Sequence, residues 1–321
     1  MEKLENKKEA ILLLLAVSGF ISVTKCILKF ITWTWKMFIR PPKNLLQYGS
    51  WAVITGPTDG IGKALAFELA SKGLNLVLIG RNTSKLDATE HEIRNLHHHK
   101  VEIKKVVFDF AKCCYGIGEN QVDDEIEDAI RGLDVGILIN NAGLAYPYAR
   151  YFHEVDVELM ESIIKVNIEG VIRVTKAVIP IMLKKKKGSI VNIGSASSGV
   201  VPSYPLYSIY AATKAYVAMF SRSMSLEYKR DGIDIQCQIP GLVATKMARI
   251  KKPSLFVPSA ENYSKASTRW IGYEQICVPY WTHHLQKFVV SILPEALVDC
   301  CLLKYFQGMR LRGFKRDSTA A

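Results

Sequence analysis

The sequence lacks the cysteine pattern of a zinc site or a disulfide framework. Its seven cysteines are an odd number, Cys113–Cys114 and Cys300–Cys301 are adjacent pairs, and no C-x-x-C occurs. We therefore expect reduced thiols and a catalytic portion that faces the cytosol. The three consecutive histidines at 97–99 cannot all face one metal from a regular helix, so for the histidines at 91 and 97–99 a solvated helix end is favoured over a metal site, and no metal is predicted.

The sequence also has no internal repeat, no low-complexity tract and a deficit of acidic residues. Its 321 residues carry 42 Lys+Arg against 30 Asp+Glu, a net charge of +12. Charged residues make up 22%, which excludes a polytopic membrane protein, and 49% are hydrophobic, which excludes a disordered chain. The positive charge favours an anionic partner, which could be a phosphate-bearing cofactor, an acidic lipid or nucleic acid. Lys184–Lys187 end a predicted helix and are interpreted as a solvated helix end, so no nucleic acid is expected.

One long apolar run lies near the N-terminus. Residues 10–31 as a helix would measure about 33 Å, enough to cross a bilayer core of about 30 Å. A membrane-surface helix and a cleaved signal peptide are the alternatives, although no A-x-A-like site precedes the lysines. Residues 1–9 have balanced charges, whereas Lys25, Lys29, Lys36, Arg40 and Lys43 follow the apolar residues 10–24 without any acid, so the rest of the chain should face the cytosol.

From Trp51 onward, short β-rich runs alternate with helical patterns. The expected strands are WAVIT, NLVLIG, VEIKKVVF, VGILIN, SIVNIG and IDIQCQ, with helices at 61–72, 84–98, 122–131, 157–183 and 207–229 between them. Such alternation predicts an α/β fold, a Rossmann-type doubly wound parallel sheet. The alternation of strand and helix patterns ends near residue 245. We therefore expect an anchor over 1–43, a dinucleotide-binding domain over 44–245 and a helical extension over 246–321.

The segment TGPTDGIG, Thr55–Gly62, follows the first strand. Its glycines allow a sharp turn and a close approach of backbone N–H groups to a pyrophosphate, although the spacing differs from G-x-G-x-x-G. Arg81 follows the second strand, where an acid would bind an NAD ribose, so with Lys63 it favours NADP(H). Asp109 either binds adenine or caps a turn. Asn140–Gly143 end the fourth strand at the edge where open α/β sheets bind ligands.

Tyr210 and Lys214 are four residues apart on a predicted helix and share one face. The ammonium is expected to lower the pKa of the phenol, which would make Tyr210 a usable proton donor and acceptor. Tyr207 lacks this partner, because Ala211 follows it at the same spacing.

The motifs TGPTDGIG, NNAG, Asn167, Ser195 and YAATK occur in an order that resembles the short-chain dehydrogenase/reductase family over about residues 48–245. The resemblance implies that Tyr210 transfers the proton, Lys214 binds the nicotinamide ribose, Ser195 steadies the carbonyl oxygen and Asn167 holds a water. It further implies an NADPH site formed by Gly56, Thr58, Asp59, Gly60, Ile61, Gly62, Arg81, Asp109, Asn141, Tyr210, Lys214, Val243 and Thr245. Counting back from the tyrosine points to Ser197, whereas counting from the strand points to Ser195, which we prefer.

Further segments resemble the microsomal 3-oxoacyl-CoA reductases of very-long-chain fatty acid elongation, most closely the plant members. These segments are RPPKNLLQYGSW, YFHEVD and GYEQICVPYWTHH. The resemblance implies a long-chain 3-oxoacyl-CoA substrate, the endoplasmic reticulum membrane and partnership with other elongation enzymes; a homo-oligomer is also possible. Lys246, Arg249, Lys251 and Lys252 either hold coenzyme A phosphates or form a solvated basic face. The alternative functions are a hydroxysteroid dehydrogenase of the 17β type and a catalytically weak membrane scaffold.

Overall fold

The computed structural model describes residues 2–96, 100–112 and 121–320, and the chain divides into two compact units, Met1–Pro41 and Pro42–Ala321. Cys113, Cys114 and His97–His99 lie outside the described residues.

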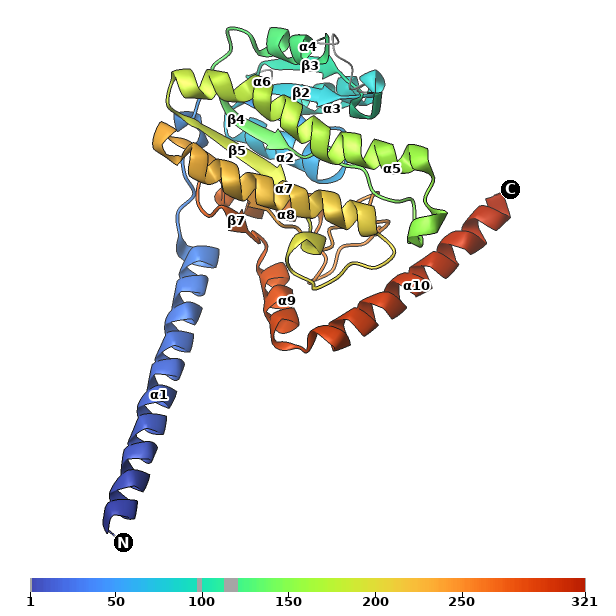
Figure 1. The fold of residues 1–321 in the computed structure, drawn as a ribbon. Coiled ribbons are helices and arrows are strands. Elements are labelled where there is room, and N and C mark those ends of the chain that lie inside the picture. The colour runs from blue at the N-terminus through green and yellow to red at the C-terminus, as the bar shows by residue number, and fades with distance from the viewer. Residues whose placement is uncertain (1, 97–99, 113–120, 321) are drawn as a thin grey trace. The chain divides into compact units, whose positions relative to one another are not determined.

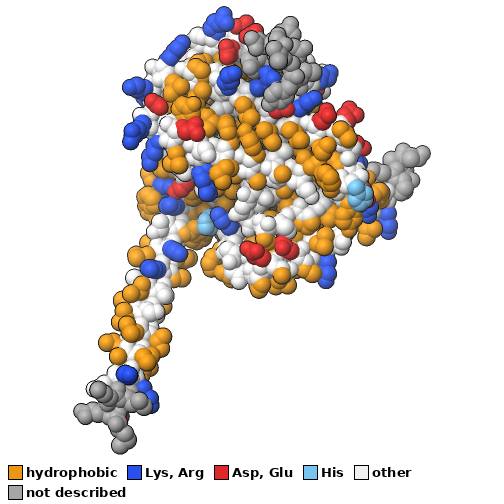
Figure 2. Space-filling model, in the orientation of Figure 1, with side chains coloured by type: hydrophobic (Ala, Val, Ile, Leu, Met, Phe, Trp, Pro, Cys, Tyr) orange, Lys and Arg blue, Asp and Glu red, His pale blue; other side chains and the backbone are white. Residues whose placement is uncertain are grey.

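The smaller unit is one long helix. α1 spans Glu2–Thr34 and continues as a π-helical turn over Trp35–Ile39. Among the described helices, only the one over Glu5–Ile39 is long and apolar enough to cross a membrane. Its apolar side chains are exposed along its length, as the orange atoms of the isolated helix in Figure 2 show. The predicted apolar helix over residues 10–31 is therefore confirmed as a candidate membrane anchor.

The larger unit contains a seven-stranded parallel sheet with the order β3-β2-β1-β4-β5-β6-β7 (Figure 1). The chain starts in the middle of the sheet, builds outward to β3 and then returns to β4 on the other side of β1. This reversal confirms the predicted Rossmann-type fold and leaves a crevice at the carboxyl ends of β1 and β4. The strands are β1 Trp51–Thr55, β2 Asn75–Gly80, β3 Ile103–Val107, β4 Val135–Asn140, β5 Gly188–Ile193, β6 Ile233–Gln238 and β7 Ile276–Cys277.

Helices cover both faces of the sheet, because side chains alternate between the faces along each strand. Val53 and Val77 pack into a core with α4, α6 and α7, whereas Ala52, Ile54 and Leu76 pack into a second core with α2 and α3. The helices are α2 Gly60–Ser71, α3 Thr83–Leu96, α4 Gln121–Ile130, α5 Val157–Ile164, α6 Gly170–Lys184, α7 Ser208–Glu227, α8 Ala260–Arg269, α9 Trp281–Ile292 and α10 Glu295–Ala320.

Two features differ from the expectation. The helix predicted over 157–183 is divided by a π-helical turn, Lys165–Glu169, between α5 and α6. The strand pattern also does not end at β6, because β7 adds two residues to the edge of the sheet. A strand of two residues is too short to show a period of two in the sequence, so the pattern could not reveal it.

The C-terminal segment belongs to the same compact unit as the sheet. α10 is tied to the rest of the unit by an ion pair between Arg310 and Glu154 and by a hydrogen bond between Ser203 and Asp299. Its Phe306 side chain is buried against Tyr204 and Tyr207. One face of the last helix therefore packs over the segment that precedes α7.

Candidate active site

Tyr210 and Lys214 lie one turn apart on α7. The Lys214 side chain is buried, and its Nζ donates a hydrogen bond to the Ile193 carbonyl oxygen over 2.9 Å. The same Nζ lies 5.9 Å from the centroid of the Tyr210 ring. Ile193 is the last residue of β5, so this contact fixes the helix against the carboxyl end of a central strand. Burial lowers the pKa of Lys214 from 10.5 to about 8.

Ser195 follows β5 and comes next to Tyr210. Its side chain is buried and hydrogen-bonded to the Tyr210 hydroxyl, and its Oγ also accepts from the Ser197 N–H over 3.2 Å. The Ala196 N–H donates to the Pro240 carbonyl over 2.9 Å, which ties this turn to the segment after β6. The buried Ser197 Oγ has no hydrogen-bond partner within the described part of the chain. The geometry thus brings Ser195, and not Ser197, to the tyrosine.

The expected effect of Lys214 on the tyrosine was wrong. Burial raises the pKa of Tyr210 above its ordinary value of 10.0, and the hydrogen bond with Ser195 acts in the opposite direction. The Lys214 ammonium lies beside the ring and binds the Ile193 carbonyl, so it does not offset the burial of the phenol. A phenol with a raised pKa keeps its proton at neutral pH, so Tyr210 is in the protonated form from which a donor acts, although the same shift makes it a weaker acid.

Asn167 lies in the π-helical turn and is fully buried. Its Nδ2 donates to the Leu144 carbonyl and to Thr213 Oγ1, each over 2.9 Å, and its Oδ1 accepts from the Leu144 N–H over 2.7 Å. A carbon atom added at Gly143 would lie 3.5 Å from Lys214 Nζ and 3.6 Å from Asn167 Oδ1. The NNAG segment therefore passes between two of the predicted site residues. Thr213, which adjoins Lys214 and bonds to Asn167, could not be identified from local sequence patterns.

The glycine loop forms a tight turn at the N-terminus of α2. Gly56 and Gly60 have φ angles of +64° and +52°, in the left-handed region that favours glycine. A Cβ at Gly62 would lie 2.2 Å from the Gly56 carbonyl oxygen and 2.2 Å from Asn141 Nδ2, so no side chain fits there. Asn141 Nδ2 donates to the carbonyls of Thr55 and Gly56 over 3.1 and 3.0 Å. This backbone cradle at a helix N-terminus fits a dinucleotide pyrophosphate.

Thr55 is a residue that the sequence analysis did not assign. Its buried Oγ1 accepts from the N–H groups of Asn141 and Ala142 over 3.0 and 2.9 Å, which fixes the end of β4 against the end of β1.

The other residues predicted in this loop differ in their contacts. Asp59 caps α2 by accepting from the Gly60 N–H over 2.8 Å, and its second oxygen pairs with Lys246 over 3.0 Å. The carbonyl of Ile61 accepts a hydrogen bond from Ser264 of α8. Thr58 lies close to the end of β2. Its Cγ2 is 3.7 Å from the position that a Cβ would occupy at Gly80, the last residue of that strand.

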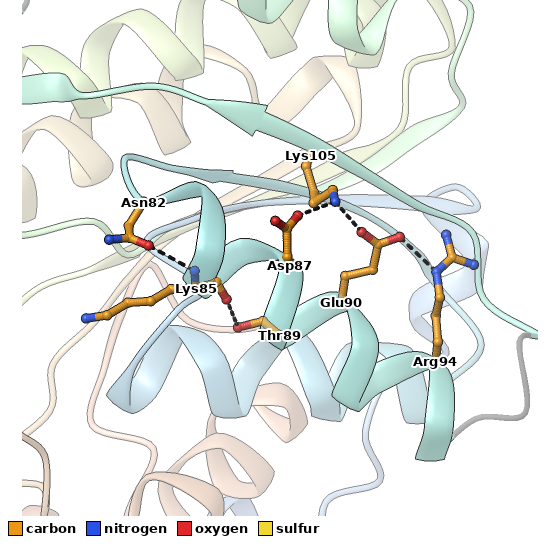
Figure 3. A network of polar contacts seen from close by, with 7 residues as sticks. All are labelled: Asn82, Lys85, Asp87, Thr89, Glu90, Arg94 and Lys105. Atoms are coloured by element: carbon orange, nitrogen blue, oxygen red, sulfur yellow. Dashed lines mark hydrogen bonds and ion pairs between the residues drawn. The ribbon is translucent and has the colours of Figure 1, made fainter.

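Arg81 is exposed and directly follows β2, at the edge where an adenosine ribose would lie. Within the described ranges no ion pair engages Arg81, whereas Lys63, the second cation expected there, pairs with Glu92 over 2.8 Å. Two neighbouring cations, Arg94 of α3 and Lys105 of β3, are also paired. Figure 3 shows Lys105 between Asp87 and Glu90, Arg94 bound to Glu90, and the Asn82 side chain capping the start of α3. This network holds the turn that carries Arg81.

Asp109 caps a turn, one of the two roles considered for it, because its Oδ1 accepts from the Ala111 N–H over 3.1 Å. Val243 is buried against Ala64 and Tyr263. Thr245 lies beside the glycine loop, with its Cγ2 3.0 Å from the position of a Cβ at Gly60.

The histidine at position 283 of α9 holds the segment after β6. The Gly241 N–H donates to His283 Nδ1 over 3.1 Å, and the other ring nitrogen, Nε2, lies 3.0 Å from the Leu242 carbonyl oxygen. This pair of contacts requires a neutral ring with its proton on Nε2. Burial lowers the pKa of His283 from 6.5 to about 4, which favours that neutral form. The sequence offered no signal for this residue, because its partners are backbone groups about 40 positions away.

A cluster of aromatic side chains, Tyr146, Tyr204, Tyr207 and Phe306, lies beside Tyr210, and we call it the aromatic wall. Tyr146 stacks on Tyr207 with ring centroids 5.3 Å apart, and Phe306 of α10 meets Tyr204 and Tyr207 at 4.7 and 5.3 Å. Tyr210 packs against the same cluster. Burial raises the pKa of Tyr207 to about 12, so this second tyrosine also stays neutral.

A separate groove of about 1110 Å³ lies between α2, residues 244–251 and the start of α8. Tyr210 and Ser195 do not line it. Cationic and acidic side chains face one another there, namely Lys63, Lys246, Arg249, Lys251 and Lys265 with Asp59, Glu68, Glu92 and Glu261. In the ranges that the structure describes, no group of three or more potential metal ligands is found.

The comparisons with known proteins agree with this geometry. A family model described as short chain dehydrogenase matches residues 50–254. The chain is 47% identical over 300 residues to a very-long-chain 3-oxoacyl-CoA reductase-like protein of Arabidopsis thaliana, covering 92% of this chain and 93% of that protein. It is 39% identical over 272 residues to a very-long-chain 3-oxoacyl-CoA reductase of Mus musculus, covering 84% of each. A short-chain dehydrogenase from Sphingobium yanoikuyae, solved in complex with NADPH, is similar with a TM-score of 0.61 and 28% identity, covering 77% of this chain and 97% of that one.

Proposed function

The chain belongs to the short-chain dehydrogenase family, and we propose that it is an NADPH-dependent reductase that converts 3-oxoacyl-CoA to 3-hydroxyacyl-CoA in very-long-chain fatty acid elongation. The observation that carries this proposal is the hydrogen-bonded pair of Tyr210 and Ser195 at the carboxyl edge of the sheet, beside the buried Lys214. A relative that matches 92% of the chain is named a 3-oxoacyl-CoA reductase-like protein, and one that matches 84% is named a 3-oxoacyl-CoA reductase, which supports the same reaction.

In this proposal Tyr210 is the proton donor. When bound, NADPH supplies the hydride that the substrate C3 receives. Tyr210 transfers its phenolic proton to the C3 oxygen as negative charge develops there, and Ser195 Oγ donates a hydrogen bond to the same oxygen. The raised pKa of Tyr210 keeps the proton on the phenol until the carbonyl accepts it.

Lys214 and Asn167 support the tyrosine in different ways. Lys214 has a pKa of about 8 and is held at the end of β5, where its remaining N–H groups are suited to bind the nicotinamide ribose hydroxyls. The side chain of Asn167 is committed to Leu144 and Thr213. A relay water at this residue would therefore be held by its backbone carbonyl, and the Asn167 side chain acts as a positioning group.

The cofactor is proposed to lie across the glycine loop. The backbone of Gly56–Gly62 would hold the pyrophosphate, and Arg81 would bind the 2′-phosphate. Asp109, or the turn that it caps, would contact the adenine. Asn141 would keep the glycine loop in place. Val243 and Thr245 would border the nicotinamide end, with His283 fixing the backbone just before them.

The aromatic wall supports an apolar substrate. Tyr146, Tyr204, Tyr207 and Phe306 form an aromatic cluster that packs against Tyr210, so an acyl chain would lie next to this cluster with its C3 carbonyl at the phenol. Lys246, Arg249, Lys251 and Lys252 are the cations proposed to meet the coenzyme A phosphates. Residues 246–321 are therefore proposed to bind the substrate.

We place the enzyme at the endoplasmic reticulum membrane, with α1 spanning the bilayer and residues from 42 onward in the cytosol. The basic flank that follows the apolar run supports this orientation. We also propose partnership with the condensing, dehydrating and enoyl-reducing enzymes of elongation. The proposed reaction uses the 3-oxoacyl-CoA that condensation forms, and it forms the 3-hydroxyacyl-CoA that dehydration uses.

The experiment that tests the substrate is competition in the detergent-solubilised full chain. A long-chain 3-oxoacyl-CoA and a steroid ketone are supplied together with NADPH, and both alcohols are quantified. Selective reduction of the acyl-CoA is expected, whereas reduction of the steroid alone would overturn the elongation function.

A second experiment addresses the scaffold alternative. Tyr210→Phe is expressed in cells that lack the elongation reductase. We expect this variant to leave elongation unrestored at wild-type protein levels, and restoration would identify a scaffold.

A further inference from the structure

The outer face of α9 and the start of α10 is apolar and exposed. We call residues 285–297 the elbow. Its exposed apolar side chains are Leu285 at 40%, Phe288 at 58%, Val289 at 44%, Ile292 at 65%, Leu293 at 40% and Leu297 at 50%. Figure 1 places the elbow at the lower edge of the larger unit, where Figure 2 shows orange side chains. A contiguous apolar surface of this kind marks a place that another apolar phase covers.

The elbow is held in place by buried residues on either side of it in the sequence. Thr282 and His283 of α9 are buried, as are Val298 and Phe306 of α10. The His283 contacts with residues 241 and 242 fix the start of α9, and the Ser203–Asp299 bond fixes the start of α10. The apolar side chains therefore lie on the outer side of a fixed corner.

The adjoining loop extends the apolar surface. The backbone of Phe256 is hydrogen-bonded to the His283 ring, which places residues 254–257 against the start of α9. Leu255 and Phe256 are exposed at 60% and 44%. Two chain segments thus contribute apolar side chains to the same side of the unit.

The elbow is too short to cross a bilayer. α9 has 12 residues, which as a helix cover about 18 Å against a hydrocarbon core of about 30 Å. Pro294 and Glu295 then interrupt the apolar sequence. A segment with this length and interruption can lie in the interface with its apolar face inward.

The charge of the surrounding segment favours an anionic surface. Residues 246–315 contain 11 Lys and Arg against 4 Asp and Glu. Lys287 lies within the elbow, and Lys304, Arg312 and Lys315 follow it on α10. Basic residues beside an apolar face suit acidic phospholipid headgroups, and they oppose pairing between two copies of this equally basic surface.

We propose that the elbow is a second membrane contact, which inserts its apolar side chains into the headgroup–acyl boundary of an anionic bilayer. The inference rests on the proposed anchoring of the chain by α1, but not on the reaction. The anchor keeps the larger unit within reach of a bilayer, so the elbow needs little affinity of its own. The contact would bring α10, and with it the aromatic wall, close to the bilayer, in which long acyl chains dissolve.

The test is lipid photocrosslinking in the full-length protein. Benzoylphenylalanine replaces Phe288 or Ile292, and the matched control position is Leu226 of α7, which is exposed at 63% on another element. Each variant is reconstituted into vesicles of phosphatidylcholine with and without phosphatidylserine and irradiated, and adducts are identified by mass. Tight binding of NADPH by each variant verifies its fold.

Adducts with phospholipid are expected at positions 288 and 292. Their yield should exceed that at position 226 by about tenfold or more, because moving one apolar side chain from water into the bilayer favours the inserted state by about that factor. It should rise further with phosphatidylserine. A crosslinked dimer would instead assign the elbow to a contact between copies, and adducts at the level of position 226 would show that it stays in water; either result overturns the proposal. Failure of the protein to float with the vesicles at all would contradict the α1 anchor as well, which separates the two failures.

Discussion

Asn167 is bound to Leu144 through both ends of its side-chain amide. The Leu144 N–H donates to Oδ1 over 2.7 Å, while Nδ2 donates back to the Leu144 carbonyl over 2.9 Å. Leu144 follows the NNAG segment, so this contact fixes the end of β4 to the π-helical turn. The third contact of Asn167, with Thr213, links the same turn to α7 next to Lys214. One buried amide thereby joins three elements of the site.

Replacing Asn167 should therefore affect stability and activity together. Asn167→Leu removes three hydrogen bonds and leaves the Leu144 N–H and carbonyl without these partners, so it should destabilise the chain by about 2–4 kcal/mol. Asn167→Asp keeps the acceptor for the Leu144 N–H but loses both donors, so it should fall between the wild type and the leucine variant. Thermal unfolding in detergent ranks the three proteins. Equal stability of Asn167→Leu and the wild type would contradict this role.

Ser195 and Ser197 provide a matched pair. Ser195→Ala removes the hydroxyl that binds Tyr210 and should lower kcat by about 10²–10³ with little change in KM, as expected for loss of a donor to the developing oxyanion. Ser197→Ala removes a buried hydroxyl without a partner among the described residues and should keep near-normal kcat. Steady-state kinetics of both variants decide the matter. A larger loss in the Ser197 variant would reverse the assignment.

Arg81 should determine the choice of cofactor. Because this exposed arginine follows β2, Arg81→Ala should raise the KM for NADPH by about tenfold or more and leave the KM for NADH nearly unchanged. Lys63→Ala is the control, since Lys63 is paired with Glu92 and should have a smaller effect. Parallel titrations with the two cofactors measure this ratio. An unchanged preference in Arg81→Ala would place the 2′-phosphate elsewhere.

His283 should make the fold sensitive to acid. Its folded pKa of about 4 lies below the ordinary 6.5, so the unfolded chain binds this proton first as the pH falls. The stability due to His283 is complete above pH 6.5 and is lost between pH 6.5 and 4. Relative to His283→Asn, the wild type should lose about 2–3 kcal/mol between pH 7.5 and 4.5. Unfolding midpoints at the two pH values measure the difference. The exposed His153→Asn variant should follow the wild type, and a parallel loss in His283→Asn would exclude the histidine as the cause.

Much of this architecture could be predicted from local sequence patterns. The buried strands β1, β2 and β4 are largely continuous apolar runs, whereas β5 and β6 contain polar residues between their apolar ones. The glycines of the first loop adopt backbone conformations that few other residues can adopt. Tyr210 and Lys214 could be paired because helical spacing alone puts them on one face. Ser195 could be preferred because the direction of β5 is fixed more rigidly than the loop that follows it.

What could not be predicted depends on contacts between distant segments. The burial that raises the pKa of Tyr210 comes from packing, and i, i+4 spacing carries no information about it. His283 acts on backbone groups of another segment, and Phe306 reaches the site from the last helix. The division of the long helix at Asn167 likewise depends on its contacts with Leu144 and Thr213, which no local period records.

The most direct test of the proposed 3-oxoacyl-CoA reduction is to trace the transferred hydride with deuterium. The full chain in detergent is given a long-chain 3-oxoacyl-CoA and NADPH deuterated at the transferred position, with Tyr210→Phe in parallel, and the product is analysed by mass spectrometry and NMR. We expect one deuterium at C3 of a 3-hydroxyacyl-CoA, and formation of that product reduced by about 10²–10⁴ in Tyr210→Phe despite intact NADPH binding. A product without deuterium at C3, or an undiminished rate in Tyr210→Phe, would contradict the account.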